Sequence, residues 1–190
     1  MENRILLSNV FRHLHTINRH KWLVMEMCFR CGMYKQGLLH DLSKYSLEEL
    51  IPSIRYYQGY RSPYGKEKEL KGYSEGWLHH KGRNKHHWEY WVDRTHGATK
   101  LVCIEMPLNY LLESVLDRIA ASKVYNGKNY NDGKAYEFFV NSKEFNVMNQ
   151  ENARQIAELL LYLQKNGEKK ALAYYRDLYR QYKRDHKSTK

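Results

Sequence analysis

The chain has 190 residues, 42% of them hydrophobic and 28% charged, a composition that suits one folded domain and excludes wholesale disorder. Lysines and arginines total 32 against 21 acidic residues, a formal net charge of +11, so we expect an anionic partner or substrate. Three cysteines are too few for a disulfide scaffold, no secretory signal is visible, and no apolar run is long enough to span a bilayer. These features predict a cytoplasmic protein that does not enter a membrane.

The apolar residues follow a helical spacing, which predicts an all-α fold of six to eight helices in a single domain over residues 1–190. The expected helices, in chain order, cover residues 2–33 (one helix or two in tandem), 38–44, 46–57, 75–91 (helix, tight turn at 81–85, helix), 107–125, 149–166 and 168–184. Ser46 and Glu49 have the spacing of a capping box, in which each side chain satisfies a free amide at a helix start. Residues 58–74, rich in glycine, tyrosine, lysine and serine, predict a surface loop or lid, and residues 185–190 a basic tail.

The strongest local signal is the segment of residues 38–44, which contains the adjacent pair His40-Asp41 and then Lys44. On a helix, adjacent side chains project about 100° apart, close enough for an imidazole nitrogen and a carboxylate oxygen to bind one cation. Nitrogen and oxygen donors together suit Fe, Mn, Co or Zn. Taken alone, the pair is also explained by an aspartate that caps a helix.

Further histidines and acids accompany this pair. His20 precedes it, and two pairs of histidines follow it, His79-His80 and His86-His87. Asp117 lies in an otherwise apolar helix, where a buried carboxylate needs a cation or several hydrogen-bond donors, and Glu113 stands one turn before it. An ion pair of Asp117 with a nearby arginine, Arg118 or Arg94, would explain the acid but not the gathering of histidines.

In this order of residues the sequence resembles the HD-domain superfamily of metal-dependent phosphohydrolases, all-α proteins that carry a His, a His-Asp pair and a final Asp on separate helices. Matched position by position, the resemblance implies a metal site formed by His20, His40, Asp41 and Asp117. Members with two metals add histidines between the pair and the last Asp. Here His79 or His80 and His86 or His87 would supply them; we favour His80 and His87, with the other two as partners of the ligands or phosphate donors. Asp41 would then bridge both metals.

Four strings resemble more closely an uncharacterised HD-like family found in bacteria and their phages, over about residues 10–135. They are HDLSK at 40–44, WLHH at 77–80, RN-x-HHW at 83–88 and EMP at 105–107. Some members of that family carry the name catalase, but no haem-ligand context is recognisable in this chain. The resemblance implies a fold and a metal site more firmly than a reaction.

The implied chemistry is that of a metal-dependent phosphohydrolase acting on a nucleotide or another small phosphate ester, with one or two ions of Fe, Mn, Co or Zn. A divalent ion lowers the pKa of bound water and leaves open positions for that water and a phosphate oxygen. Lys44 matches a lysine often seen after the His-Asp pair and could clamp a phosphate. Arg83 could neutralise charge in the transition state, and Glu113 could orient a ligand or act as a base. A solvated basic face is the alternative explanation of both cations.

Two other classes of function stay open. The charge of +11 favours a nucleic-acid-binding protein with a structural metal site. Basic and aromatic residues between Tyr174 and Arg184 could touch nucleic acid or an acidic partner, but long side chains that cover a packed face explain them more plainly. Two irons on the same ligands would suit an oxidase or a peroxide-handling enzyme.

Two further features of the sequence are weaker evidence of function. Cys28 and Cys31 have the spacing of a redox pair, but no βαβ pattern accompanies them, so two buried cysteines one turn apart explain them better. We expect the remaining histidines, apart from those in the cluster, to be ordinary surface or hydrogen-bonded residues: His13, His15, His96 and His186.

Overall fold

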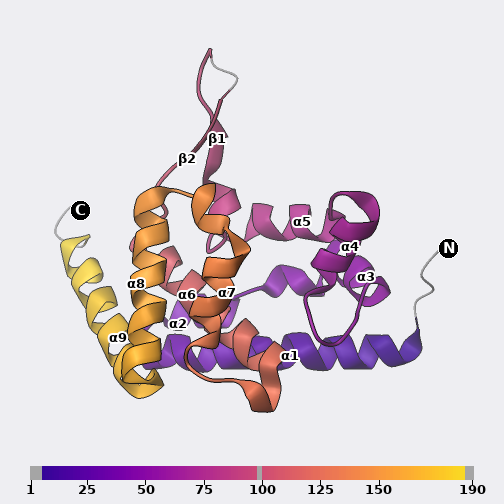
Figure 1. Ribbon diagram of the computed structural model, residues 1–190, viewed down its shortest axis with the longest axis horizontal. Helices are drawn as coiled ribbons and strands as arrows, with labels where there is room; N and C mark the ends of the chain where they lie inside the picture. The colour runs from indigo at the N-terminus through magenta and orange to yellow at the C-terminus, as the bar shows by residue number, and fades with distance from the viewer. Residues whose placement is uncertain (1–5, 98–99, 187–190) are drawn as a thin grey trace.

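The computed structural model describes residues 6–97 and 100–186, and these form a predominantly helical fold, which confirms the all-α class (Figure 1). The described residues form nine α-helices, more than the six to eight expected. The described helices, in chain order, are α1 (Leu7–Arg30), α2 (Tyr34–Leu39), α3 (Leu47–Arg55), α4 (Pro63–Lys71), α5 (Glu75–Arg83), α6 (Leu108–Asn126), α7 (Lys134–Ser142), α8 (Gln150–Asn166) and α9 (Glu168–Asp185). Short 3-10 turns are η1 (Leu42–Tyr45), η2 (Trp88–Trp91), η3 (Gly127–Asn129) and η4 (Glu144–Asn146). Strands β1 (Val92–Arg94) and β2 (Leu101–Cys103) pair antiparallel in a hairpin, with Asp93 opposite Val102.

Helix α6 is the centre of the packing, because it contacts α1, α7, α8 and α9. It begins after Pro107 and ends before Gly127, whose φ of 52° and ψ of −120° form a combination that glycine adopts readily and residues with a Cβ do not. Apolar residues of α6 are buried in the same core as those of α1, α8 and α9. Glu113 and Asp117 lie on this helix, so its packing carries both carboxylates into the interior.

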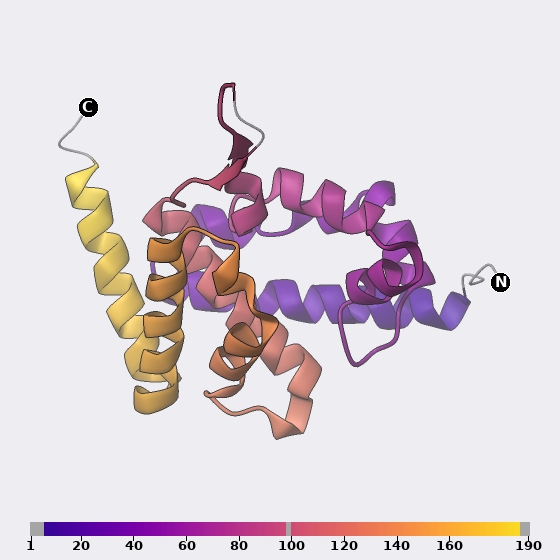
Figure 2. The same ribbon diagram turned by 45° about the horizontal axis from the view of Figure 1, so that its top comes forward.

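The elements divide between two ends of the long helix α1. In both views α3 and α4 lie at its N-terminal end, α8 and α9 lie at the other, and the hairpin projects from the body (Figure 1, Figure 2). Within the described ranges, no helix combines the length and the apolarity that a membrane crossing requires.

The expected boundaries of the last two helices are confirmed by their caps. The side chain of Asn149 accepts from the amides of Glu151 and Asn152 at the start of α8, and Gly167, with φ of 78°, separates α8 from α9. α9 extends to Asp185, and the rest of the expected basic tail, from 187 onward, lies outside the described residues.

The expectation of a loop over residues 58–74 is wrong in its centre, where α4 forms. Pro63 occupies its first turn, where the missing amide costs nothing, and Gly72 ends it with φ of 81°. The signal was hidden because α4 is short and mostly polar, so its apolar face is weak.

Residues 75–91 also differ from the expected helix, turn and helix. α5 continues through Lys81 to Arg83 without a turn, and the second segment is the 3-10 turn η2 rather than a helix. The hairpin that follows, and α7, were not expected either. Strands of three residues are too short to show alternation in a sequence.

Helices α1 and α2 approach each other closely at Gly37. A Cβ on Gly37 would lie 2.9 Å from Cβ of Cys28 and 3.2 Å from the ring of Phe29. Cys28 and Cys31 are free and buried there, in agreement with their interpretation as core residues.

We therefore expect Gly37→Ala to destabilise the protein by about 1–3 kcal/mol, because overpacking would push α2 away from α1. Gly65→Ala is the matched control, since a Cβ on Gly65, within α4, would meet nothing within 4 Å. It should stabilise by about 0.5–1 kcal/mol, through the better helix propensity of alanine. Urea unfolding of both variants measures the difference, and equal effects would refute the close contact.

Candidate metal centre

The pair His40-Asp41 lies in a break between helices, not on the helix expected over residues 38–44. α2 ends before His40, whose ψ of 127° is extended, and η1 begins after Asp41, whose φ of 52° is left-handed. A non-glycine residue in this region costs about 1 kcal/mol or more, and such residues cluster at functional sites. The two side chains therefore converge because the backbone turns sharply between them, not because of a helical spacing.

Lys21 on α1 holds this break in place, a role that sequence reasoning missed. Its ammonium donates to the carbonyl oxygens of Leu38, at 3.0 Å, and of His40, at 2.7 Å. These carbonyls belong to the end of α2 and the residue after it, where a cation is favoured by the helix dipole.

Four donor atoms from three parts of the chain form what we call the first group: His20 Nε2, His40 Nε2, Asp41 Oδ2 and Asp117 Oδ1. His20 Nε2 lies 2.9 Å from Asp117 Oδ1 and 3.4 Å from His40 Nε2, which is 3.3 Å from Asp41 Oδ2. Donors that each lie about 2.1 Å from one ion, at right or tetrahedral angles, are about 3.0–3.4 Å apart. The separations within the first group run from 2.9 to 3.8 Å, close to those of ligands around one transition-metal ion.

A second group meets the other oxygen of Asp41 and consists of Asp41 Oδ1 and the Nε2 atoms of His80, His86 and His87. Asp41 Oδ1 is 3.4 Å from His80 Nε2 and 3.4 Å from His86 Nε2, and His87 Nε2 is 2.9 Å from His80 Nε2. The structure therefore brings all six expected ligands to one place and adds His86 to them. His86 and His87 both reach the group, so the geometry does not separate them.

Glu113 lies behind both groups, in the position of a carboxylate that orients ligands. Its Oε1 is 3.0 Å from His40 Nδ1 and 3.2 Å from His86 Nδ1. A carboxylate can only accept, so Nδ1 of each ring carries a proton and Nε2 faces the donor groups, where its lone pair would bind a cation. One carboxylate thus orients one histidine of each group.

Glu49 plays the same part for the second group, and sequence reasoning missed it. Its Oε1 is 2.7 Å from His79 Nδ1 and its Oε2 is 2.8 Å from His80 Nδ1, so His79 turns to Glu49 while His80 reaches the donors.

Within the described residues the side chain of Ser46 makes no cap hydrogen bond, so the expected capping box is wrong. Burial and the charge of Lys44 lower the pKa of His80, which keeps its ring neutral.

The cluster is acidic although the chain is strongly basic. Burial alone would raise the pKa of Asp41, but the charges of His40 and Lys44 outweigh it and hold the pKa well below its usual range. Burial is likewise outweighed at Asp117, where hydrogen bonds from His20 and His40 keep the pKa low. Burial opposes the charge of His40, but Asp41 and a hydrogen bond to Asp117 raise the pKa of His40 well above its usual value. With the other imidazoles neutral, the four carboxylates face the cations His40 and Lys44 among the described residues, a balance of 4 − 2 = 2 negative charges.

Two buried polar atoms show that a cation fits this cluster. Asp41 Oδ1 and His86 Nε2 have no hydrogen-bond partner within the described part of the chain, and they lie 3.4 Å apart. Leaving a buried donor or acceptor unpaired costs about 1–3 kcal/mol, and more for a charged group. A divalent ion between the two atoms would remove that cost and part of the negative charge.

Of the two cations expected to act at the site, Lys44 lies in it and Arg83 does not. The ammonium of Lys44 lies 2.6 Å from Asp41 Oδ2, so a solvated basic face does not explain it. Burial alone would lower the pKa of Lys44, but Asp41 raises it above the usual value. Arg83 is exposed at the end of α5, where its charge acts on the exposed Glu48, and no contact with the donors is found in the described residues.

Position decides against Arg118 as the partner of Asp117. Arg118 binds Glu144, with Nη2 and Oε2 2.7 Å apart, and Arg94 belongs to the projecting hairpin. An ion pair with Arg118 therefore does not explain why Asp117 points into the cluster.

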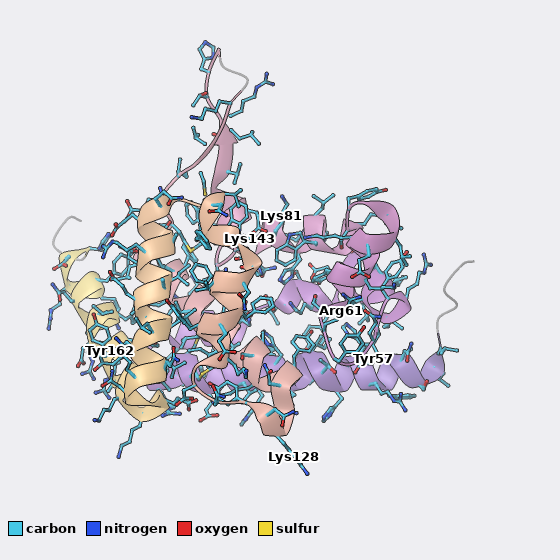
Figure 3. All side chains as sticks on the ribbon, in the orientation of Figure 1. Tyr57, Arg61, Lys81, Lys128, Lys143 and Tyr162 are labelled. Carbon is cyan, nitrogen blue, oxygen red and sulfur yellow. The ribbon has the colours of Figure 1, made fainter. Side chains whose placement is uncertain are left out.

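His13 is buried, not a surface histidine as expected. It is 4% exposed, and its Nδ1 has no hydrogen-bond partner in the described chain. Its ring packs edge-on against Tyr57, labelled in Figure 3, with centroids 5.5 Å apart. Burial, reinforced by the charge of Lys44, lowers the pKa of His13 to about 4.

This shift predicts a loss of stability in mild acid. The unfolded chain binds a proton at His13 below about pH 6.5 while the folded chain does not, so stability is complete above that pH and falls toward pH 4. The loss attributable to His13 is about 3 kcal/mol. His13→Phe should reduce the difference in unfolding free energy between pH 7 and pH 4.5, whereas His15→Phe, on the exposed side of α1, should not. Equal pH dependence in both variants, measured by urea unfolding, would contradict this assignment.

Comparison with known proteins gives one match. A family model described as a family of unknown function, DUF5662, matches residues 9–162, a range that contains both donor groups and both orienting carboxylates. No curated protein and no solved structure gives a significant match.

Proposed function

The chain belongs to the DUF5662 family of unknown function, and from that starting point we propose that it is a metal-dependent phosphohydrolase of a nucleotide or another small phosphate ester. The observation that carries the proposal is the carboxylate of Asp41, whose two oxygens face two different groups of donors. Pairs of ions held close together are a common device of phosphatases and nucleases. The shared carboxylate supports a site for two ions, with the first group able to hold one ion alone.

The fold proposal follows the same residues. His20 comes from α1, His40 and Asp41 from the break before η1, and Asp117 from α6, the order that the HD-domain superfamily would give. Their convergence supports an HD-like fold.

The residues of the chain would act as follows. A bound divalent ion supplies a Lewis acid and a water of lowered pKa. Glu113 and Glu49 hold the imidazoles so that their lone pairs point inward. Lys44, 20% exposed in its side chain and next to Asp41, offers an ammonium to a phosphate oxygen at the edge of the site.

Elemental analysis tests the proposal first. Protein purified without chelator and without a histidine tag should contain about one or two equivalents of Fe, Mn, Co or Zn. The loaded protein should release inorganic phosphate from at least one member of a panel of nucleotides and small phosphate esters, and chelation should abolish the release. Protein that holds no metal and cannot be loaded would overturn the proposal.

Two alternatives have observations of their own. Imidazole and carboxylate donors around a shared aspartate also suit a pair of irons, so two irons with consumption of oxygen or peroxide and no phosphate release would favour an oxidative enzyme. The second half of α9 exposes Arg180, Lys183 and Arg184, which supports the nucleic-acid-binding alternative. Salt-dependent binding of RNA or DNA that is lost when these three are replaced would favour it.

A further inference from the structure

Lys44 contacts one atom of each donor group. Its Nζ lies 2.6 Å from Asp41 Oδ2, which belongs to the first group, and 3.3 Å from His80 Nε2, which belongs to the second. The ring of Tyr64 lies beneath the ammonium, 5.9 Å from centroid to nitrogen. The lysine therefore stands between the two groups, at their edge.

The two contacts of Lys44 differ in whether they leave a lone pair free to bind a metal ion. A carboxylate oxygen has two lone pairs, so Asp41 Oδ2 can accept from Lys44 and still bind a cation. An imidazole nitrogen has one lone pair in the ring plane. Because Glu49 Oε2, 2.8 Å from His80 Nδ1, accepts the proton on that nitrogen, the lone pair of His80 is on Nε2. Lys44 Nζ contacts this atom at 3.3 Å, and Nε2 of His87, itself a member of the second group, faces it at 2.9 Å.

We propose that Lys44 is a built-in competitor for the metal ion of the second group. An ion can join the first group while Lys44 stays in place, whereas an ion in the second group needs the lone pair of His80 and must displace the ammonium. The first group then binds metal more tightly than the second. The inference rests on the proposed function, since it takes both groups to be metal sites.

A phosphate group is the ligand that would draw Lys44 away. Its oxygens carry negative charge, so a hydrogen bond from the ammonium to phosphate is stronger than one to the neutral ring of His80. Lys44 is on the short turn η1 and its side chain is 20% exposed, so the ammonium is accessible from solvent. By linkage, phosphate that releases His80 strengthens metal binding in the second group, and metal there strengthens phosphate binding by the same factor. A phosphate-bearing substrate would thus complete the site to which it binds.

Calorimetry with Mn²⁺ on the metal-stripped, full-length protein tests this directly. Wild-type protein in chloride buffer should bind a second ion about tenfold more weakly than the first. Inorganic phosphate, dilute enough to leave Mn²⁺ in solution, should reduce this difference in affinity by strengthening the binding of the second ion. Lys44→Met should reduce the difference in affinity in chloride buffer without phosphate. In this variant, phosphate should no longer change the affinity for the second ion.

Lys81→Met is the matched control for charge. Lys81, labelled in Figure 3, lies beside His80 on α5, and none of its described contacts is with a donor atom. Its removal should change the affinity for the second ion less than about threefold, as for a partly exposed charge.

The outcomes separate this inference from the function on which it rests. Two sites of equal affinity, or a second site that phosphate leaves unchanged in wild type, would overturn the competition while leaving the phosphohydrolase proposal intact. So would a second site that is no stronger in Lys44→Met. Protein that binds no Mn²⁺ in any buffer would overturn both. The comparison of buffers needs no variant, so it holds even if Lys44→Met fails to fold.

Discussion

Asp41→Asn is expected to remove metal from both donor groups and to lower any phosphohydrolase activity by about a hundredfold or more. Residues that merely orient ligands are worth about 10–100-fold, and Asp41 offers one oxygen to each group. Asparagine has the same shape and tolerates the left-handed backbone at φ of 52°, so the break between α2 and η1 should keep its conformation. The asparagine variant therefore removes a charge and an oxygen without straining the backbone. Alanine at this φ would add backbone strain.

The measurement is elemental analysis of protein purified without chelator, together with far-ultraviolet circular dichroism. Asp177→Asn is the matched control, because Asp177 is exposed on α9, with 64% of its side chain accessible. Helicity should be close to that of wild type in both variants. If Asp41→Asn retained the full metal content, the assignment of ligands would be wrong.

Glu113→Gln should weaken metal binding in both groups by about 10–100-fold. The same Oε1 accepts from His40, a donor of the first group, and from His86, a donor of the second. Glutamine keeps the size of the side chain but removes the charge, and its amide nitrogen can turn toward the imidazoles that need an acceptor. The lone pairs of both rings would then be less basic and less well directed.

Glu49→Gln provides the comparison, because Glu49 contacts His80 and His79 and no donor of the first group among the described residues. It should weaken the second group and spare the first. Separate Mn²⁺ affinities for the two groups, measured with thermal unfolding to check the fold, distinguish the variants. Equal losses in both groups from Glu49→Gln would refute the division between them.

The sequence predicted the donors better than it predicted how they are held. His20, Asp117 and the paired histidines are visible because charged or metal-binding side chains stand out in apolar helices. Glu49 and Lys21 are not visible. Their partners lie 30 and 19 residues away, and a contact that depends on how helices pack leaves no local pattern.

The fold shows the same division. The caps at Asn149 and Gly167 lie next to the residues that they satisfy, so the boundaries of α8 and α9 could be predicted. The bend at Asp41 could not, because a left-handed aspartate is set by the surrounding packing, including the contact of Lys21 with the carbonyl of His40. The expectation that His40 and Asp41 point to one centre is therefore correct, but the helical spacing from which it was argued is not present.

If the cluster holds metal as proposed, its excess of negative charge makes folding of the chain depend on the supply of cations. Its carboxylates come from α3, α6 and the break after α2, so they repel one another as these segments come together. An ion that binds the folded form and not the unfolded chain offsets that repulsion and raises the unfolding free energy with its own concentration. Cells short of the metal would then hold less folded protein, and the amount of this chain would itself report on the metal available.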